Sequence, residues 1–206
     1  MSVVLMSPYP KRLVPILARS DEVIVCETPV TAAGLCAWRA DWLVCFGYRH
    51  ILRPDVLDAV GGRAVNLHMS LLPWNRGAHP NLWSVVEDTP KGGSLHLVDP
   101  GIDTGAILAQ RPATFDPATT LRASYAALSD LLVGLLADHW PDIRTGRLSG
   151  SPQDPGAGTF HRSRDLARVW PHLKAGWDTR IADVPRLPAR TLASSGDSDV
   201  TTAHKA

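Results

Sequence analysis

The segment Val65-Asn-Leu-His-Met-Ser-Leu-Leu-Pro-Trp-Asn-Arg-Gly77 decides how the rest of this chain is arranged. Its first residues predict a strand in which Asn66 and His68 project from the same face, because side chains alternate along a pleated backbone. Pro73 cannot donate to a sheet ladder, so the strand is expected to end before it. A carboxamide and an imidazole then lie side by side at a strand's C-terminal end, where open α/β sheets bind ligands. Taken alone, Asn-x-His also fits a polar strand with no chemical role.

The stretches before this segment alternate between apolar runs and helix-forming runs. Strands are predicted at residues 2–6, 22–26 and 42–46, and helices at residues 11–19, 31–39 and 53–60. This alternation favours an α/β fold, with a Rossmann-like, mostly parallel twisted sheet and flanking helices in a single domain. The first strand is followed by Ser7-Pro8-Tyr9-Pro10, where a dinucleotide-binding chain would carry Gly-x-Gly-x-x-Gly, so NAD is not an expected ligand.

A second informative stretch is His96-Leu-Val-Asp-Pro-Gly-Ile-Asp-Thr-Gly105, which predicts a strand running into a tight turn. Its Pro-Gly pair and its final glycine are residues that turns favour. Asp103 stands near the tip, where an aspartate on its own most often caps a turn. A further strand is predicted at residues 106–110, and Gln110 at its end is expected to support the turn.

The two stretches together resemble the folate-dependent formyltransferase family. The resemblance rests on Asn-x-His-x-Ser-Leu-Leu-Pro from residue 66 and Asp-x-Gly-x-Asp-Thr-Gly-x-Ile-x-x-Gln from residue 99, in this order. The family includes glycinamide ribonucleotide, methionyl-tRNA and amino-sugar N-formyltransferases. The region before Asn66 is short for the family, and in this the chain resembles the compact formylation domains of some nonribosomal peptide synthetases.

The resemblance implies that a formyl group moves from 10-formyltetrahydrofolate to a primary amine, with Asn66, His68 and Asp103 as the catalytic residues. The Asn66 amide and a protonated His68 are expected to stabilise the oxyanion that forms when the amine attacks. Asp103 is expected to orient His68, raise the population of its imidazolium, and relay protons between the amine and the leaving nitrogen.

The resemblance also implies where the pterin ring of the cofactor binds. Main-chain groups and apolar cover are expected from the loop after the third strand, and the loop at residues 98–102 is expected to close the other side. The cofactor-binding residues predicted in this way are Tyr48, His50, Ile51, Leu52, Val98, Asp99 and Gly101.

The residues directly after the catalytic strand are predicted to bind the amine acceptor. They are Trp74, Arg76 and His79. Arg76 could hold a phosphate or a carboxylate of the acceptor, and an arginine that caps a solvated loop is the alternative interpretation.

The rest of the chain is predicted to be structural. A packing helix is expected from Thr120 to Trp140, ended by Pro141. Gly158-Thr-Phe-His161 is similar to a segment found late in amino-sugar formyltransferases and in formylation domains of peptide synthetases. We expect a catalytic domain over residues 1–184 and a disordered tail over residues 185–206, which is rich in small and polar residues.

Composition excludes several classes of function. The 206 residues carry a net charge of +1, which indicates neither nucleic acid nor an anionic membrane as a partner. No run approaches the roughly 20 apolar residues of a membrane span. The three cysteines form no Cys-x-x-Cys pair, and Cys26 and Cys45 are predicted to be buried thiols. We expect a cytoplasmic protein with no metal, for which a homodimer is one possible assembly.

Two alternative functions remain open. A hydrolase would remove the formyl group from the same cofactor with water as the acceptor, although the family's hydrolases carry an additional domain. A folate-binding module would need no catalytic residues, so the three polar residues argue against it. The acceptor is also open, with a nucleotide-linked amino sugar and an amino acid, either free or carrier-bound, as the candidates.

Overall fold

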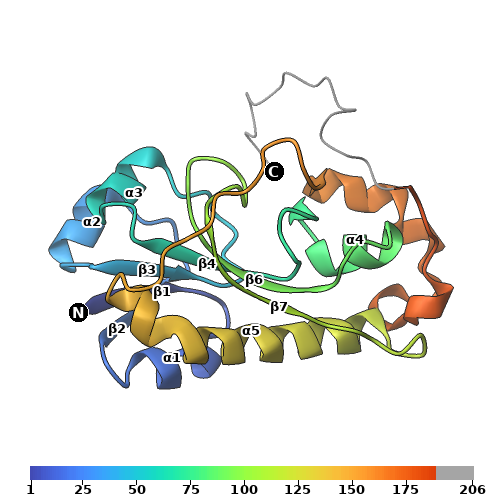
Figure 1. The fold of residues 1–206 in the computed structure, drawn as a ribbon, viewed down its shortest axis with the longest axis horizontal. Helices are drawn as coiled ribbons and strands as arrows, with labels where there is room; N and C mark the ends of the chain where they lie inside the picture. Colours follow the sequence, from blue (N-terminus) through green and yellow to red (C-terminus); the bar gives the residue numbers. More distant parts are fainter. Residues whose placement is uncertain (189–206) are drawn as a thin grey trace.

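The computed structural model describes residues 1–188, and its larger sheet has six strands in the order β2-β1-β3-β4-β6-β7 (Figure 1). These strands are β1 (Ser2–Met6), β2 (Glu22–Val25), β3 (Trp42–Cys45), β4 (Ala64–His68), β6 (Gly92–Leu97) and β7 (Ile107–Pro112). The strands from β2 to β4 pair in parallel, whereas β6 runs antiparallel to both β4 and β7. The predicted α/β fold with a mostly parallel sheet is confirmed, with an antiparallel pair of strands added at one edge.

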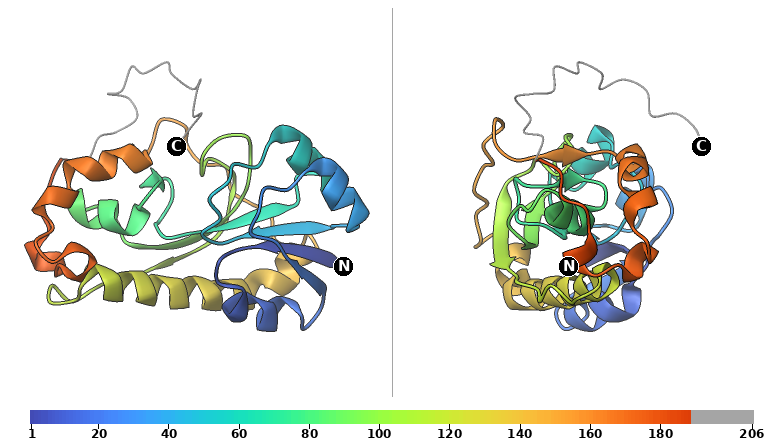
Figure 2. Two further views of the ribbon diagram at one scale, coloured as in Figure 1. Left: turned by 180° about the vertical axis from the view of Figure 1, so that it is seen from behind. Right: turned by 90° about the vertical axis from the view of Figure 1, so that its right-hand side faces the viewer.

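Helices cover both faces of this sheet, and the strands supply a separate core to each face (Figures 1 and 2). The helices are α1 (Pro10–Leu17) and α5 (Leu121–Arg144) on one face, and α2 (Ala32–Ala37) and α3 (Pro54–Ala59) on the other. Alternation along β4 places Val65 and Leu67 in the core on the α5 side. Asn66 and His68 therefore project from the opposite face, as the sequence predicts.

A third core lies beyond the carboxyl end of β4, where α4 (Pro80–Val86) packs against the last part of the described chain (Figure 1). A small second sheet joins these parts, because β5 (Arg76–Gly77) pairs in parallel with β8 (Phe160–His161). Leu187 donates a main-chain hydrogen bond to Val86 of α4 and packs against this core. The packed part of the chain thus continues beyond the predicted boundary at residue 184, and the predicted tail from residue 189 onward lies outside the described residues.

The prediction that Pro141 ends the long helix was wrong, because α5 continues to Arg144. Pro141 removes one helical hydrogen bond, but the turn around it is held by tertiary contacts. Trp140 and Ile143 are buried, and the Trp140 indole N–H donates to Asp21 at 2.9 Å. The Arg144 guanidinium lies 2.7 Å from the same carboxylate. No helix within residues 1–188 is long and apolar enough to cross a membrane.

Candidate active site

The site is built where the loop between β6 and β7 folds back over the carboxyl end of β4. Asp103, in this loop, has a φ of 55°, a left-handed conformation that aspartate tolerates better than most residues. The Gln153 amide holds the loop by donating to the main-chain oxygens of Asp103 at 2.9 Å and of Gly105 at 2.8 Å. A Cβ at Gly105 would lie 1.9 Å from the Leu97 oxygen, so only glycine permits this return of the chain.

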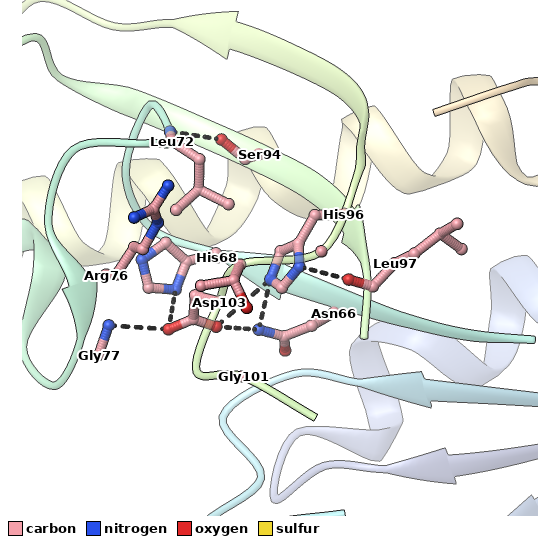
Figure 3. Close-up of polar contacts among 12 residues, drawn as sticks. Asn66, His68, Leu72, Arg76, Gly77, Ser94, His96, Leu97, Gly101 and Asp103 are labelled. Carbon is pink, nitrogen blue, oxygen red and sulfur yellow. Dashed lines mark hydrogen bonds and ion pairs between the residues drawn. The ribbon is translucent and has the colours of Figure 1, made fainter. Parts of the chain in front are cut away.

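The Asp103 carboxylate is the centre on which the polar side chains of the site converge (Figure 3). Its Oδ2 accepts a hydrogen bond from the Gly77 N–H at 2.8 Å and lies 3.5 Å from His68 Nδ1. Its Oδ1 accepts from Asn66 Nδ2 at 3.2 Å and lies 3.3 Å from His96 Nε2. The three predicted catalytic residues are therefore in direct contact.

Asp103 carries a negative charge at neutral pH. Burial opposes its ionisation, but His68, His96 and the Gly77 N–H together outweigh burial and hold the pKa of Asp103 well below its usual range. A buried carboxylate that accepts hydrogen bonds from the Gly77 N–H and from Asn66 is a fixed anion against which a neighbouring imidazole can gain a proton.

His68 is almost completely buried, with 6% of its surface exposed. Its Nε2 lies 2.9 Å from the Asn75 carbonyl oxygen, a normal hydrogen-bond distance at which Nε2–H donates. The 3.5 Å between Nδ1 and Asp103 is longer, so we assign the neutral tautomer with its lone pair on Nδ1. Burial lowers the pKa of His68 more than Asp103 and the Asn75 carbonyl raise it. The prediction of a protonated His68 is therefore corrected. The resting side chain is neutral, and its Nδ1 can accept a proton.

His96 is a member of the site that the sequence alone did not reveal. It lies directly opposite Asn66 across the β4–β6 ladder. Its Nδ1–H donates to the Leu97 oxygen at 2.8 Å, which leaves Nε2 to accept from Asn66 Nδ2 at 3.2 Å. The Asn66 amide thus donates to both His96 and Asp103. One of these bonds must give way before that amide can donate to a developing oxyanion.

The turn that ends β4 is held by a chain of hydrogen bonds from neighbouring strands. Ser94 Oγ accepts from the Leu72 N–H at 3.1 Å and donates to the Ser70 oxygen at 2.6 Å. The Gln110 amide donates to the Leu72 oxygen at 2.8 Å, so Gln110 supports the turn that ends β4. This bracing fixes the segment that carries the Asn75 carbonyl bonded to His68.

The residues predicted to bind the acceptor differ in their accessibility. Trp74 and His79 are half-buried, and burial lowers the pKa of His79. Arg76 is only 3% exposed, and its Nε and one terminal nitrogen donate to the Gln153 side-chain oxygen at 3.0 and 2.8 Å. The predicted grip of Arg76 on an acceptor anion is therefore corrected, because its guanidinium holds two loops of the protein together.

The loop after β3 forms one wall beside the site. Ile51 is 71% exposed, whereas Leu52 is buried in the core under α3. Tyr48 donates its hydroxyl to the Thr28 oxygen at 2.9 Å, and its ring lies 5.2 Å from that of His50. Within residues 1–188, the main-chain groups of residues 50–52 have no hydrogen-bond partner. Unpaired main chain at the exposed residues His50 and Ile51 fits the edge of a pterin ring.

The loop at residues 98–102 begins beside the start of β4, where the Val98 N–H donates to the Ala64 oxygen at 2.8 Å, and its predicted closure over the cofactor stays a prediction. Asp99 stabilises this loop by accepting from the Gly101 N–H at 3.1 Å and from the Thr104 hydroxyl at 2.7 Å. Val98 packs against the same core as Leu52. Ile102, which the sequence did not single out, is 46% exposed and faces solvent as Ile51 does.

Cys45 lies beneath the site, opposite Asn66 in the β3–β4 ladder. Burial, assisted by the charge of Asp103, raises the pKa of its thiol to about 12. Cys26 is also buried and unpaired, so both predicted buried thiols are confirmed. Cys45 stays protonated and cannot serve as a nucleophile at neutral pH.

Comparison with known proteins gives consistent matches. Residues 28–137 match the family model described as formyl transferase. The crystal structure of the formyltransferase PseJ from Anoxybacillus kamchatkensis, in complex with UDP-4,6-dideoxy-4-formamido-L-AltNAc and tetrahydrofolate, is 38% identical with a TM-score of 0.84. That similarity covers 89% of this chain and 97% of PseJ.

Other relatives are more distant or longer. A likely sugar N-formyltransferase from Mycobacterium tuberculosis, Rv3404c, has a TM-score of 0.72 at 23% identity over 82% of this chain and 78% of its own, which shows a shared fold. A methionyl-tRNA formyltransferase from Synechococcus is 35% identical over 133 residues, which cover 64% of this chain and 41% of the relative. The match thus spans less than half the length of this relative.

Proposed function

Because the chain belongs to the folate-dependent formyl transferase family, we propose that it transfers the formyl group of 10-formyltetrahydrofolate to a primary amine. The observation that carries this proposal is the convergence of Asn66, His68 and Asp103 at the end of β4. The unpaired main chain of residues 50–52 supports the binding of the folate donor beside them.

His68 and Asp103 act as the proton-transfer pair in this proposal. The donor supplies a formyl carbon that an amine can attack and a nitrogen that can leave. His68 Nδ1 accepts the proton that the attacking amine loses, and the resulting imidazolium lies 3.5 Å from Asp103 Oδ2. The same nitrogen then returns the proton to the leaving nitrogen, so that no net proton is gained or lost.

Asn66 acts on the oxygen of the formyl group. Negative charge develops on that oxygen during attack, and an amide N–H directed at it stabilises the transition state. His96 and Asp103 accept the two Asn66 N–H groups. Binding of the donor therefore has to break one of these hydrogen bonds. The Asn66 amide can stabilise the transition state only when the donor is bound in the position that breaks it.

The acceptor that we propose is a small or carrier-bound metabolite with a primary amine, and a nucleotide-linked amino sugar is favoured over an amino acid. PseJ, which binds a UDP-linked formamido sugar, matches nearly its whole length to this chain. A net charge of +1 provides no excess of cationic side chains for a tRNA backbone.

The test is incubation with 10-formyltetrahydrofolate and a panel of amines, with mass-spectrometric detection of a gain equal to the mass of CO. We expect transfer to at least one amine by the wild type, and a loss of at least about 10² in kcat in His68→Ala. Release of formate without any amine would identify a hydrolase instead. Folate binding without turnover of any amine would identify a binding module and refute the proposal.

A further inference from the structure

Gln153 joins two loops of the catalytic cluster and was not singled out from the sequence. Its Nε2 donates to the main-chain oxygens of Asp103 and Gly105 at 2.9 and 2.8 Å. Its Oε1 accepts from Nε and from one terminal nitrogen of Arg76 at 3.0 and 2.8 Å. A carboxamide has two N–H donors and two lone pairs on its oxygen, so every hydrogen-bonding position of Gln153 is used and its orientation is fixed.

The main chain next to Gln153 is anchored to the larger sheet. Ser151 and Ile107, the first residue of β7, exchange two main-chain hydrogen bonds of 2.8 Å each. Gln153 comes two residues after this bridge, so its side chain reaches the two loops from a fixed base. It therefore holds the loops in place and does not simply follow them.

Arg76 carries a buried positive charge that is bound only by neutral oxygens. Its acceptors are the Gln153 amide oxygen and, at 3.4 Å, the Asp154 main-chain oxygen, and it forms no ion pair in the described part of the chain. Burial lowers the pKa of Arg76, and the more distant carboxylates of Asp103, Asp99 and Asp154 oppose that change. Arginine stays protonated in proteins, so its charge acts on the groups around it.

His68 is one of the groups on which this charge acts (Figure 3). Burial lowers the pKa of His68 most, and the charge of Asp103 opposes that effect. His96 and Arg76 lower the pKa of His68 further, whereas the Asn75 carbonyl raises it. The charge of Arg76 thus favours the neutral ring that accepts the proton of the amine. It also makes the imidazolium readier to give that proton to the leaving nitrogen.

Arg76 also positions a hydrogen-bond donor to Asp103. It directly precedes Gly77, whose N–H donates to Asp103 Oδ2 at 2.8 Å. Gln153 therefore holds the main chain of Asp103 and, through Arg76, the segment that binds its carboxylate. Without Gln153 the two loops could separate, and the 3.5 Å between His68 Nδ1 and Asp103 Oδ2 would no longer be fixed.

We propose that Gln153 and Arg76 are positioning residues for formyl transfer. Gln153 holds the Asp103 loop at its distance from His68, and the Arg76 guanidinium, bound by neutral oxygens, keeps its positive charge beside His68. This inference rests on the proposed function, because it assigns both residues a role in the proton transfer between the amine and the leaving nitrogen.

Substitution of Gln153 tests its hold on the Asp103 loop. Gln153→Met keeps the length of the side chain but removes its hydrogen bonds, so kcat should fall about 10–100-fold as the catalytic groups lose their alignment. Asp103 should recede from His68, which lowers the pKa of His68 and moves the acidic limb of kcat/KM to lower pH. Gln153→Glu keeps the acceptor of Arg76 and removes both donors, so it should lower kcat by a similar factor.

Substitution of Arg76 tests the charge. Arg76→Met removes the charge and should raise the pKa of His68, so the acidic limb of kcat/KM should move up by about 0.5 pH unit or more. Arg76→Lys keeps the charge without the two-pronged contact, and its acidic limb should stay within about 0.2 pH unit of the wild type. Titration of the His68 imidazole by NMR should show the same shifts in the absence of any substrate.

Two exposed residues outside the catalytic cluster provide matched controls. Ser149→Glu adds a charge to the segment that carries Gln153. Arg147→Met removes an arginine that is 67% exposed and paired with Asp142. Both variants should keep the kcat and the acidic limb of the wild type.

Wild-type kcat or an unmoved acidic limb in a folded Gln153→Met protein would overturn the role of Gln153. If Gln153→Met does not fold, wild-type kcat in Gln153→Glu overturns it. An unmoved His68 titration in Arg76→Met would overturn the role of Arg76, and Arg76→Gln, which also removes the charge, replaces that variant if it does not fold.

These failures leave the proposed function standing wherever the wild type formylates an amine. Absence of formyl transfer by the wild type, together with the expected shifts in the His68 titration, would instead refute the proposed function alone.

Discussion

Replacement of Asp103 by asparagine removes one charge and keeps the size of the side chain. If His68 becomes an imidazolium during the reaction, Asp103 stabilises it from 3.5 Å. At an effective dielectric constant of about 20, opposite unit charges at that distance attract by about 5 kcal/mol. Each 1.36 kcal/mol corresponds to a factor of ten in rate, so we expect kcat to fall by about 10³ in Asp103→Asn.

The cost in stability should be much smaller. The asparagine oxygen can still accept from the Gly77 N–H, and the substitution removes only the hydrogen bond that Asn66 donates to the other carboxylate oxygen. One such bond contributes about 1 kcal/mol to the free energy of unfolding. Asp116→Asn is the matched control, because Asp116 accepts from the Ala118 N–H at 2.8 Å in a turn outside the catalytic cluster. It should lose similar stability and keep its kcat.

The pH dependence separates a role in proton transfer from a role in the turn. A neutral His68 must accept the proton, so kcat/KM should rise with pH through the pKa of His68, which lies below its ordinary 6.5. Without the charge of Asp103 that pKa falls further, and the acidic limb should move to lower pH. Stopped assays across pH 4–8 with saturating donor measure this shift. A near-normal kcat together with an unmoved acidic limb would refute the assignment of Asp103.

Individual hydrogen bonds predict the effects of three other substitutions. His96→Phe keeps a ring but removes the acceptor of Asn66, so kcat should fall about tenfold in steady-state assays, and an unchanged kcat would exclude a positioning role. Thr159→Val removes a buried hydroxyl that accepts from the Asn75 N–H at 2.9 Å, so denaturant unfolding should show a loss of about 1–3 kcal/mol. Burial opposes ionisation of Asp21, but its contacts with Arg144 lower the pKa of Asp21 overall. The charge of Asp21 therefore stabilises the folded protein above pH 3.8, and this stabilisation is lost as pH falls through the folded pKa. Asp21→Asn should flatten that part of the acid-unfolding curve.

Local patterns predicted the parts of the site that depend on neighbouring residues in the chain. Alternation along β4 was enough to place Asn66 and His68 on one face. The turn residues around Asp103 predicted a tight loop, and the resemblance of both motifs to one family predicted that the loop reaches the end of β4. The contacts of Asp103 with both residues agree with this prediction.

Features that depend on strand register or burial were not predictable. His96 contacts Asn66 only because β4 and β6 pair in one particular register, which no local pattern specifies. Arg76 follows the catalytic strand as a substrate-binding arginine would, yet Gln153, which lies 77 residues later, withdraws it from solvent. The charge state of His68 was also not predictable from local sequence, because the effect of burial on its pKa exceeded that of the nearby carboxylate. The continuation of α5 through Pro141 likewise depends on Asp21, a residue distant in sequence.

The segment at residues 158–161 supplies no reacting group, but the geometry of the site depends on it. Arg76 donates its main-chain N–H to the Thr159 oxygen at 2.9 Å, and Ala78 donates to the His161 oxygen at 2.8 Å. A Cβ at Gly77, between these two bonds, would lie 2.2 Å from the His161 oxygen, so the strands approach this closely only with glycine there. The same Gly77 directs its N–H at Asp103. The late segment therefore positions a donor to the central carboxylate through its main-chain oxygens.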